Sequence, residues 1–153
     1  MQKGSTIIMM IETNSPEETY EEGFRIGKSA QAGQIYCIKG DLGVGKTVFT
    51  KGFAAGLGIT ETISSPTFTI VNEYHEGRLS LYHFDVYRIS DSDEMYEIGC
   101  EEYFFGDGVC LIEWAELIKD ILPENVVWIT IEKELEKGMD YRKINIDEER
   151  KVS

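Results

Sequence analysis

The chain has 153 residues, 42 % of them hydrophobic and 28 % charged, and its formal net charge at pH 7 is −13. This length and composition predict a single globular domain over residues 1–153, and no apolar stretch approaches the length of a membrane span. The acidic balance argues against a large nucleic-acid surface, because phosphate binding needs clustered Lys and Arg, so any RNA is expected to be met through a partner.

The N-terminal part predicts a strand and then a helix. Residues 1–11 hold one Lys and a short apolar run without a small-residue cleavage site, which favours a strand over a signal peptide. A cytoplasmic location is therefore expected. Ser15, Pro16 and Glu18 are typical of a helix start, as N-cap, first helical residue and capping-box acid. The helix is predicted to run to about Ala32.

Residues 40–47 fit the phosphate-binding pattern G-x-x-x-x-G-K-[ST]. The apolar run at 35–38 predicts a strand before this loop, and residues 47–55 predict a helix after it, which is the context that the pattern requires. The glycines let successive backbone N–H groups face inward and form an anion nest at a helix N-terminus. The sequence therefore predicts a nucleoside triphosphate site made by Gly40, Asp41, Leu42, Gly43, Val44, Gly45, Lys46, Thr47 and Val48.

Two residues at the end of this loop are expected to have distinct roles. The Lys46 ammonium should lie between the β- and γ-phosphates, and the Thr47 hydroxyl is a ligand type suited to Mg²⁺. The alternative interpretation is a glycine-rich turn before a helix. The four fixed positions arise by chance on the order of once in a hundred chains of this length, which favours the phosphate site.

The segment after the loop helix predicts a phosphate sensor and a hairpin. Residues 64–69 read Ser-Ser-Pro-Thr-Phe-Thr, and Thr67 is the candidate that senses the γ-phosphate, with an ordinary turn as the alternative. Residues 68–75 and 79–87 predict two antiparallel strands. A hairpin added to a parallel strand–helix–strand core gives a mixed sheet.

The part of the chain after residue 89 predicts a helix opening at residues 90–94, a buried strand over 109–112, a short helix over 114–122, and strands over 126–132 and 141–147. Counting the N-terminal run, about seven strands are expected. The fold class is therefore α/β: a three-layer sandwich similar to P-loop NTPases, with a mixed sheet, an antiparallel hairpin and helices on both faces.

Two carboxylates compete for the place beside Mg²⁺ that a phosphate-loop NTPase needs. Glu113 ends the fully apolar strand, at the edge where open α/β sheets bind ligands, and we assign it to the metal. Asp85 ends a strand of mixed polarity, and we assign it to the γ-phosphate side, where it could orient or deprotonate the attacking water. The alternatives are a strand-end carboxylate paired with Arg88 and, for Glu113, a carboxylate favoured by a helix N-terminus.

The cysteines do not predict a metal or redox site. Cys37, Cys100 and Cys110 are odd in number and far apart, and none forms a C-x-x-C pair. Neither His75 nor His83 lies at ligand spacing from a cysteine. The thiols are therefore expected to be small buried hydrophobic groups.

Four motifs, in order and spacing, resemble the bacterial TsaE family, the ATPase of tRNA threonylcarbamoyladenosine synthesis. They are the phosphate loop, Ser-Pro-Thr-Phe-Thr at 65–69, His-Phe-Asp-Val-Tyr-Arg at 83–88 and Ile-Glu-Trp at 112–114. The resemblance spans about residues 12–147. One departure is visible: many members have Pro after the Glu-Trp pair, where this chain has Ala115, which affects only the start of the local helix.

The resemblance implies a cytoplasmic, Mg²⁺-dependent ATPase that converts ATP to ADP and phosphate. It implies work with the proteins TsaD and TsaB in placing threonylcarbamoyl on adenosine 37 of tRNAs that read ANN codons, with tRNA met only through the complex. The family's residue roles map onto Lys46 for phosphate, Thr47 and Glu113 for Mg²⁺, Asp85 for hydrolysis and Thr67 for a switch segment.

The resemblance also places Thr19 near the nucleotide and Trp114 beside the metal acid, although a Trp in so apolar a region can simply fill volume. No arginine finger is evident, and Arg88 is the nearest candidate, so turnover is expected to be slow alone and faster with partners. Two other functions stay open. One is a small-molecule kinase, which usually carries an arginine-bearing lid; the other is a nucleotide-dependent scaffold without meaningful turnover.

Overall fold

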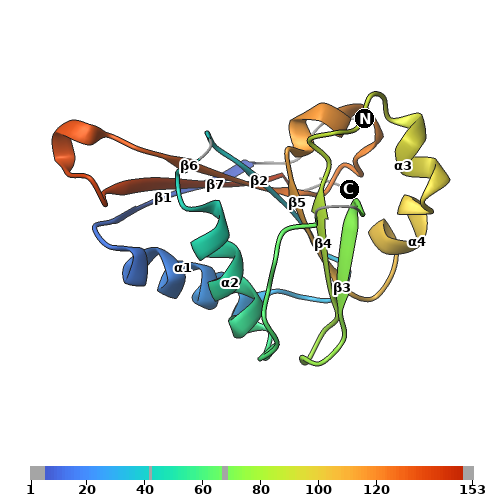
Figure 1. The fold of residues 1–153 in the computed structure, drawn as a ribbon, viewed down its shortest axis with the longest axis horizontal. Helices are drawn as coiled ribbons and strands as arrows, with labels where there is room; N and C mark the ends of the chain where they lie inside the picture. Colours follow the sequence, from blue (N-terminus) through green and yellow to red (C-terminus); the bar gives the residue numbers. More distant parts are fainter. Residues whose placement is uncertain (1–5, 42, 67–68, 150–153) are drawn as a thin grey trace.

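A mixed sheet runs through the molecule in the computed structural model, which describes residues 6–41, 43–66 and 69–149 (Figure 1). Its strands, in the spatial order β1-β7-β6-β2-β5-β4-β3, are β1 (Thr6–Thr13), β2 (Ile35–Lys39), β3 (Val71–Tyr74), β4 (Leu81–Asp85), β5 (Val109–Glu113), β6 (Val127–Glu132) and β7 (Arg142–Glu149). The strands β6, β2, β5 and β4 are parallel, whereas β7 and β1 on one side and β3 on the other are antiparallel to their neighbours. The predicted mixed sheet with a hairpin is confirmed.

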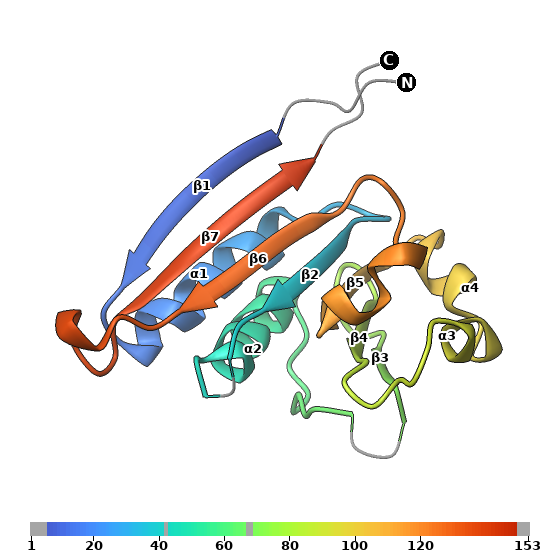
Figure 2. The same ribbon diagram turned by 90° about the horizontal axis from the view of Figure 1, so that it is seen from above.

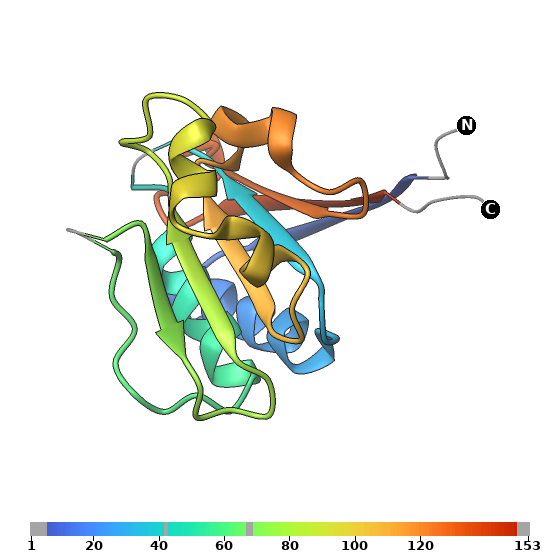
Figure 3. The ribbon, with the colours of Figure 1, turned by 90° about the vertical axis from the view of Figure 1, so that its right-hand side faces the viewer.

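Helices cover both faces of this sheet, as the sequence predicts (Figure 3). One face carries α1 (Pro16–Ser29) and α2 (Lys46–Gly56), and the other carries α3 (Asp93–Glu97), α4 (Cys100–Phe104) and the 3-10 helix η1 (Ala115–Ile121), while η2 (Leu135–Lys137) lies between β6 and β7. Alternate strand residues enter two separate cores: Ile38 packs on the α1/α2 side, and Cys37 packs on the other. The three-layer fold is therefore built by period-two alternation.

The α1 and α2 helices contact each other backbone to backbone through two pairs of glycines, Gly23 and Gly27 on α1 and Gly52 and Gly56 on α2. A Cβ at Gly27 would lie 2.1 Å from a carbonyl oxygen of α2, and one at Gly52 would lie 2.0 Å from a carbonyl oxygen of α1. Only glycine permits this approach. The helix that follows the phosphate loop is thereby held against a fixed partner.

The first helix begins where the sequence predicts and ends earlier. The Ser15 hydroxyl accepts from the Glu18 N–H at 3.1 Å, and the Glu18 carboxylate accepts from the Asn14 N–H at 2.8 Å. The helix ends at Ser29, not Ala32, because Arg78 donates to the carbonyls of Gly27, Lys28 and Ala30 at its C-terminus. That guanidinium comes from the β3–β4 connection, so the local sequence did not indicate the stop.

Other predicted elements differ in length or type. The hairpin strands are shorter than the predicted 68–75 and 79–87, and residues 67–68 lie outside the described residues. The short helix expected to open at residues 90–94 is α3, which ends before Gly99, whereas α4, which follows this glycine with its φ of +77°, was not predicted. The helix expected over 114–122 is a 3-10 helix that begins after Trp114, a residue with φ of 64°. Within the described ranges, no helix is both long and apolar enough to cross a bilayer.

The three cysteines are free and buried, as predicted. Burial raises the pKa of the Cys37 thiol far above its ordinary value and the pKa of Cys110 to about 12. Both lie in the core that faces α3, α4 and η1. The thiols therefore behave as small apolar groups of that core.

Candidate nucleotide-binding site

The loop between β2 and α2 has the backbone conformation that its glycines suggest. Gly43 and Gly45 adopt φ angles of +78° and +104°, which L side chains rarely adopt, and Gly45 is the N-cap of α2. Glycine offers no side-chain cap, so the first N–H groups of α2 are left for another acceptor. Val44 is buried in the α1/α2 core and anchors the loop there. The predicted Leu42 lies outside the described residues.

Lys46 reaches back from the start of α2 across this loop. Its Nζ donates to the Gly40 carbonyl at 2.8 Å and lies 4.2 Å from the centroid of the Trp114 ring. The residue is only 7 % exposed, and the Tyr87 ring packs against the same indole with centroids 4.8 Å apart. An ammonium desolvated in this way gains from exchanging a neutral carbonyl for a phosphate oxygen.

The two candidate carboxylates, Asp85 and Glu113, end neighbouring parallel strands in register. Glu113 also pairs with Ile38 of β2, the strand that feeds the loop. Residues at alternate positions on the same strands, Leu81 and Leu111, belong to the core under α1 and α2. By this alternation both carboxylates lie on the face that carries α2, at the carboxyl edge of the sheet where ligands of open α/β folds bind.

These carboxylates have different surroundings. Glu113 is 7 % exposed, and its Oε2 lies 2.7 Å from Nε2 of His83, which is buried. Asp85 is half-buried, and its Oδ1 accepts the backbone N–H of Tyr87 at 3.0 Å. Sequence reasoning missed the His83 contact. The only available signal was its position two residues before Asp85, which places both on one face of β4.

A cavity of about 190 Å³ opens beside the loop, on the α1 side. It is lined by Pro16, Thr19, Gly43, Val44, Gly45, Val48, Asp140 and Arg142. Thr19 is buried, and its hydroxyl lies 2.7 Å from that of Thr13. Two residues predicted near the nucleotide, Thr19 and Val48, are therefore brought together with the loop, although 29 positions separate them in the chain.

Arg142 ties the antiparallel end of the sheet to the phosphate loop. Its Nε donates to the Val44 carbonyl at 2.6 Å, and its Nη1 donates to the carbonyls of Met139 and Tyr141 at 2.8 and 2.7 Å. The residue is the first of β7, nearly a hundred positions after the loop. No local pattern in the sequence indicated this contact.

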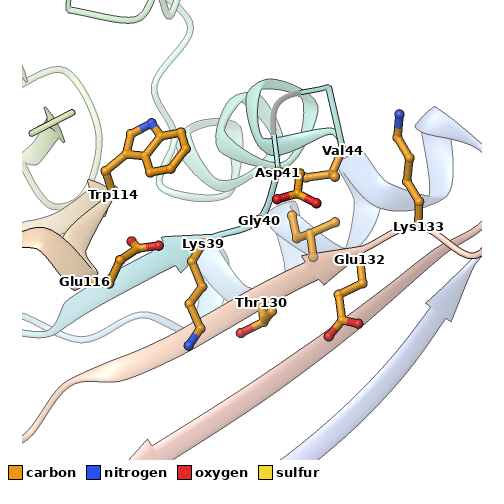
Figure 4. Close-up of a pocket in the computed structure, with 10 residues that line it drawn as sticks. Lys39, Gly40, Asp41, Val44, Trp114, Glu116, Thr130, Glu132 and Lys133 are labelled. Carbon is orange, nitrogen blue, oxygen red and sulfur yellow. The ribbon is translucent and has the colours of Figure 1, made fainter. Parts of the chain in front are cut away.

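A larger cavity of about 610 Å³ borders the start of the loop (Figure 4). Its lining residues are Lys39, Gly40, Asp41, Val44, Trp114, Glu116, Thr130, Ile131, Glu132 and Lys133. Trp114 and Glu116 lie at one end and Lys133 at the other. The cavity thus connects the indole beneath Lys46 with the carboxyl ends of β2 and β6, and its walls carry charges of both signs.

The Mg²⁺ ligands that the sequence predicts near the loop are oxygen groups of two side chains. In the described parts of the chain, no group of three or more His, Cys, Asp or Glu side chains could hold a metal ion. Mg²⁺ is commonly held by one or two protein oxygens together with substrate phosphates and water. Thr47, exposed at the start of α2, and the buried Glu113 provide such oxygens.

The predicted sensor Thr67 lies outside the described residues. The residues on either side of it are held by side-chain contacts. Asn72 donates to the Ser64 carbonyl at 3.1 Å and accepts from the Thr69 hydroxyl at 3.3 Å. These contacts hold Ser64 and Thr69 next to the start of β3, and the role of the 64–69 segment as a switch stays a prediction.

Comparisons with known proteins agree with the residue patterns. The family model described as "Threonylcarbamoyl adenosine biosynthesis protein TsaE" matches residues 13–144. The tRNA threonylcarbamoyladenosine biosynthesis protein TsaE of Bacillus subtilis is 50 % identical over 132 residues, 86 % of this chain and 80 % of that protein. The protein of the same name from Treponema pallidum is 44 % identical over 119 residues, 78 % of this chain and 87 % of that protein.

A solved structure has the same fold. The crystal structure of YdiB from Bacillus subtilis aligns with a TM-score of 0.80 at 42 % identity. The alignment covers 94 % of this chain and 87 % of that one. The likeness therefore extends over the sheet and both helical layers.

Proposed function

Because the chain belongs to the TsaE family of tRNA threonylcarbamoyladenosine biosynthesis proteins, we propose that it is a cytoplasmic Mg²⁺-dependent ATPase serving that modification. The reaction is hydrolysis of ATP to ADP and phosphate, in support of threonylcarbamoylation of adenosine 37 in tRNAs that read ANN codons. The observation that carries the proposal is that Lys46, the phosphate loop and two strand-end carboxylates lie on the same face of the sheet.

The proposed pose places the triphosphate in the loop, with the nucleoside extending toward the cavity lined by Thr19 and Val48. Lys46 then moves its ammonium from the Gly40 carbonyl to a phosphate oxygen, which strengthens the hydrogen bond because the acceptor becomes charged. Arg142 holds the loop in place through the Val44 carbonyl. A loop held in this way needs less ordering when phosphate binds.

The two carboxylates take different parts in this proposal. Thr47 and Glu113 would hold Mg²⁺, which supplies positive charge that neutralises phosphate oxygens. Asp85, half-buried at the neighbouring strand end, orients or deprotonates the attacking water. The hydrogen bond from the Tyr87 N–H holds one oxygen of this carboxylate in place.

Partner proteins complete the proposal. The net charge of −13 argues against a large nucleic-acid surface on this chain, so we propose that it meets tRNA through TsaD and TsaB. We expect slow turnover by the protein alone and faster turnover in the complex, since a correctly placed cation contributes about 10³ to 10⁵ in rate to phosphoryl transfer.

The test measures ADP and inorganic phosphate from the purified protein alone and again after TsaD and TsaB are added, with tRNA modification followed in parallel. Equal amounts of ADP and free phosphate, rising with the partners, support hydrolysis. ADP that appears only with a hydroxyl acceptor would support a small-molecule kinase instead. Full modification by the Asp85→Asn variant, without hydrolysis, would support a nucleotide-dependent scaffold.

A further inference from the structure

We propose that His83 is a positioning residue that orients the Glu113 carboxylate and thereby sets how tightly the site holds Mg²⁺. The inference rests on the proposed function, because it assigns Glu113 to the metal. It assigns a role to a buried residue of β4, the strand that also carries Asp85.

The contact joins two neighbouring strands on the face of the sheet that carries α1 and α2. Nε2 of His83 on β4 lies 2.7 Å from Oε2 of Glu113 on β5, and the side chains are only 2 % and 9 % exposed. A carboxylate removed from water to this degree needs a donor, because an unpaired buried charge is strongly unfavourable. His83 provides that donor and fixes which way the carboxyl plane faces.

The hydrogen bonding of His83 points to a role at Glu113 rather than in the core generally. Within the described residues, His83 Nδ1 is one of two buried side-chain polar atoms with no hydrogen-bond partner, and Thr50 Oγ1 is the other. Most buried side-chain polar atoms, ring nitrogens of histidine included, have a hydrogen-bond partner. Here the described contact of the ring is the one to Glu113, so retaining a polar residue at this depth serves that carboxylate.

The position of His83 also links the two acids. It precedes Asp85 by two residues on β4, so both side chains lie on the face of the sheet that carries α2. Glu113 is the register partner of Asp85 on β5. The imidazole therefore ties the strand that carries the proposed water-orienting carboxylate to the carboxylate proposed for the metal.

The experiment measures binding of a fluorescent, non-hydrolysable ATP analogue as Mg²⁺ is titrated, and again with the metal removed by chelation. His83→Leu is expected to raise the Mg²⁺ concentration at half-saturation about 10-fold, the lower end of the range for residues that orient metal ligands. His83→Gln, whose amide places a donor near the position of Nε2, should restore most of the wild-type value. Metal-free affinity should stay unchanged in both variants.

Thr50→Val is the matched control, because it replaces the other buried and unpartnered polar side chain with an apolar one of similar size. Its Mg²⁺ titration should match that of the wild type. If His83→Leu does not fold, as judged by circular dichroism, His83→Gln is compared with His83→Asn, which places its donor nearer Nδ1. A lower Mg²⁺ requirement in the Gln variant supports the inference, and equal requirements overturn it.

Failure of the inference is distinct from failure of the proposed function. A His83→Leu titration that matches the wild type, while Glu113→Gln shifts it, removes His83 from the site and leaves the function standing. A shift in His83→Leu without one in Glu113→Gln also overturns the inference, because the effect would not pass through that carboxylate. A wild-type protein that binds no nucleotide at any Mg²⁺ concentration contradicts the proposed function itself.

Discussion

The two faces of the sheet are built by different means. On one face, α1 and α2 pack backbone to backbone through paired glycines, and this face carries Lys46, His83 and Glu113. The opposite face is covered by helices of five to seven residues that pack through side chains. There the Phe84 ring contacts those of Tyr103 and Phe104, among buried thiols.

This difference places the proposed reacting groups on one face of the sheet and leaves the other face to bury apolar surface. The proposed reacting groups must hold fixed positions, and they lie on the face where glycine contacts leave the helices little freedom to shift. The core of the opposite face is made of apolar side chains and thiols, among them Ile112 and Cys110. Figure 2 shows the sheet from above, with β1 and β7 as long paired strands on the side away from the short helices.

The largest expected effect concerns the thiols of the covering face. Because burial raises the pKa of Cys37 and Cys110 and shields both from solvent, we expect labelling by a thiol reagent at pH 8 to be at least about 100-fold slower in the folded protein than in denaturant. Labelling kinetics followed by absorbance or mass spectrometry check this. Fast labelling of native protein would show that the short helices open readily, and the contrast between the faces would weaken.

Lys46→Ala removes a buried positive charge from the face of the sheet that carries α1 and α2. We expect the affinity for ATP to fall about 10- to 100-fold, since hydrogen bonds to charged groups contribute about 1.5–3 kcal/mol. Calorimetric titration with Mg²⁺ present measures it, and Lys39→Ala is the control because that residue lines the neighbouring cavity. Unchanged affinity in Lys46→Ala would remove this residue from the site.

Gly27→Ala tests the glycine contact directly. The added Cβ meets a backbone oxygen of α2 that cannot turn aside, so we expect a loss of about 1–3 kcal/mol in the free energy of unfolding, with weaker nucleotide binding as α2 shifts. Gly99→Ala, between α3 and α4, is the control: no atom lies within 4 Å of its Cβ, and its cost comes from φ of +77° alone. Equal losses of nucleotide affinity in both variants would contradict the difference between the faces.

The smallest expected effect comes from Glu76. The N–H and hydroxyl of Thr60 lower the pKa of this carboxylate from 4.5, so its contribution to stability is present above that pH and is lost as the pH falls through the lowered pKa. Glu76→Gln should reduce the thermal midpoint slightly at pH 7. The difference from the wild type should shrink in scans below pH 4, and a constant difference would mean that the charge is not responsible.

Local patterns predict those parts of the molecule that depend on nearby residues. The phosphate loop, the capping of the first helix and the apolar strands were predicted because each is encoded within about ten positions. The shorter α1 depends on Arg78, and the loop is held by Arg142, each brought from a distant strand or turn. The His83 contact spans 30 positions and becomes visible only once β4 and β5 are in register.

The most direct test of the central claim is a crystal structure of the protein with Mg²⁺ and a non-hydrolysable ATP analogue. The account predicts that phosphate oxygens lie about 3 Å from the backbone nitrogens of the loop at 40–47. It also predicts that Lys46 Nζ has left the Gly40 carbonyl for a phosphate oxygen. An analogue bound elsewhere, with Lys46 still on Gly40, would contradict it.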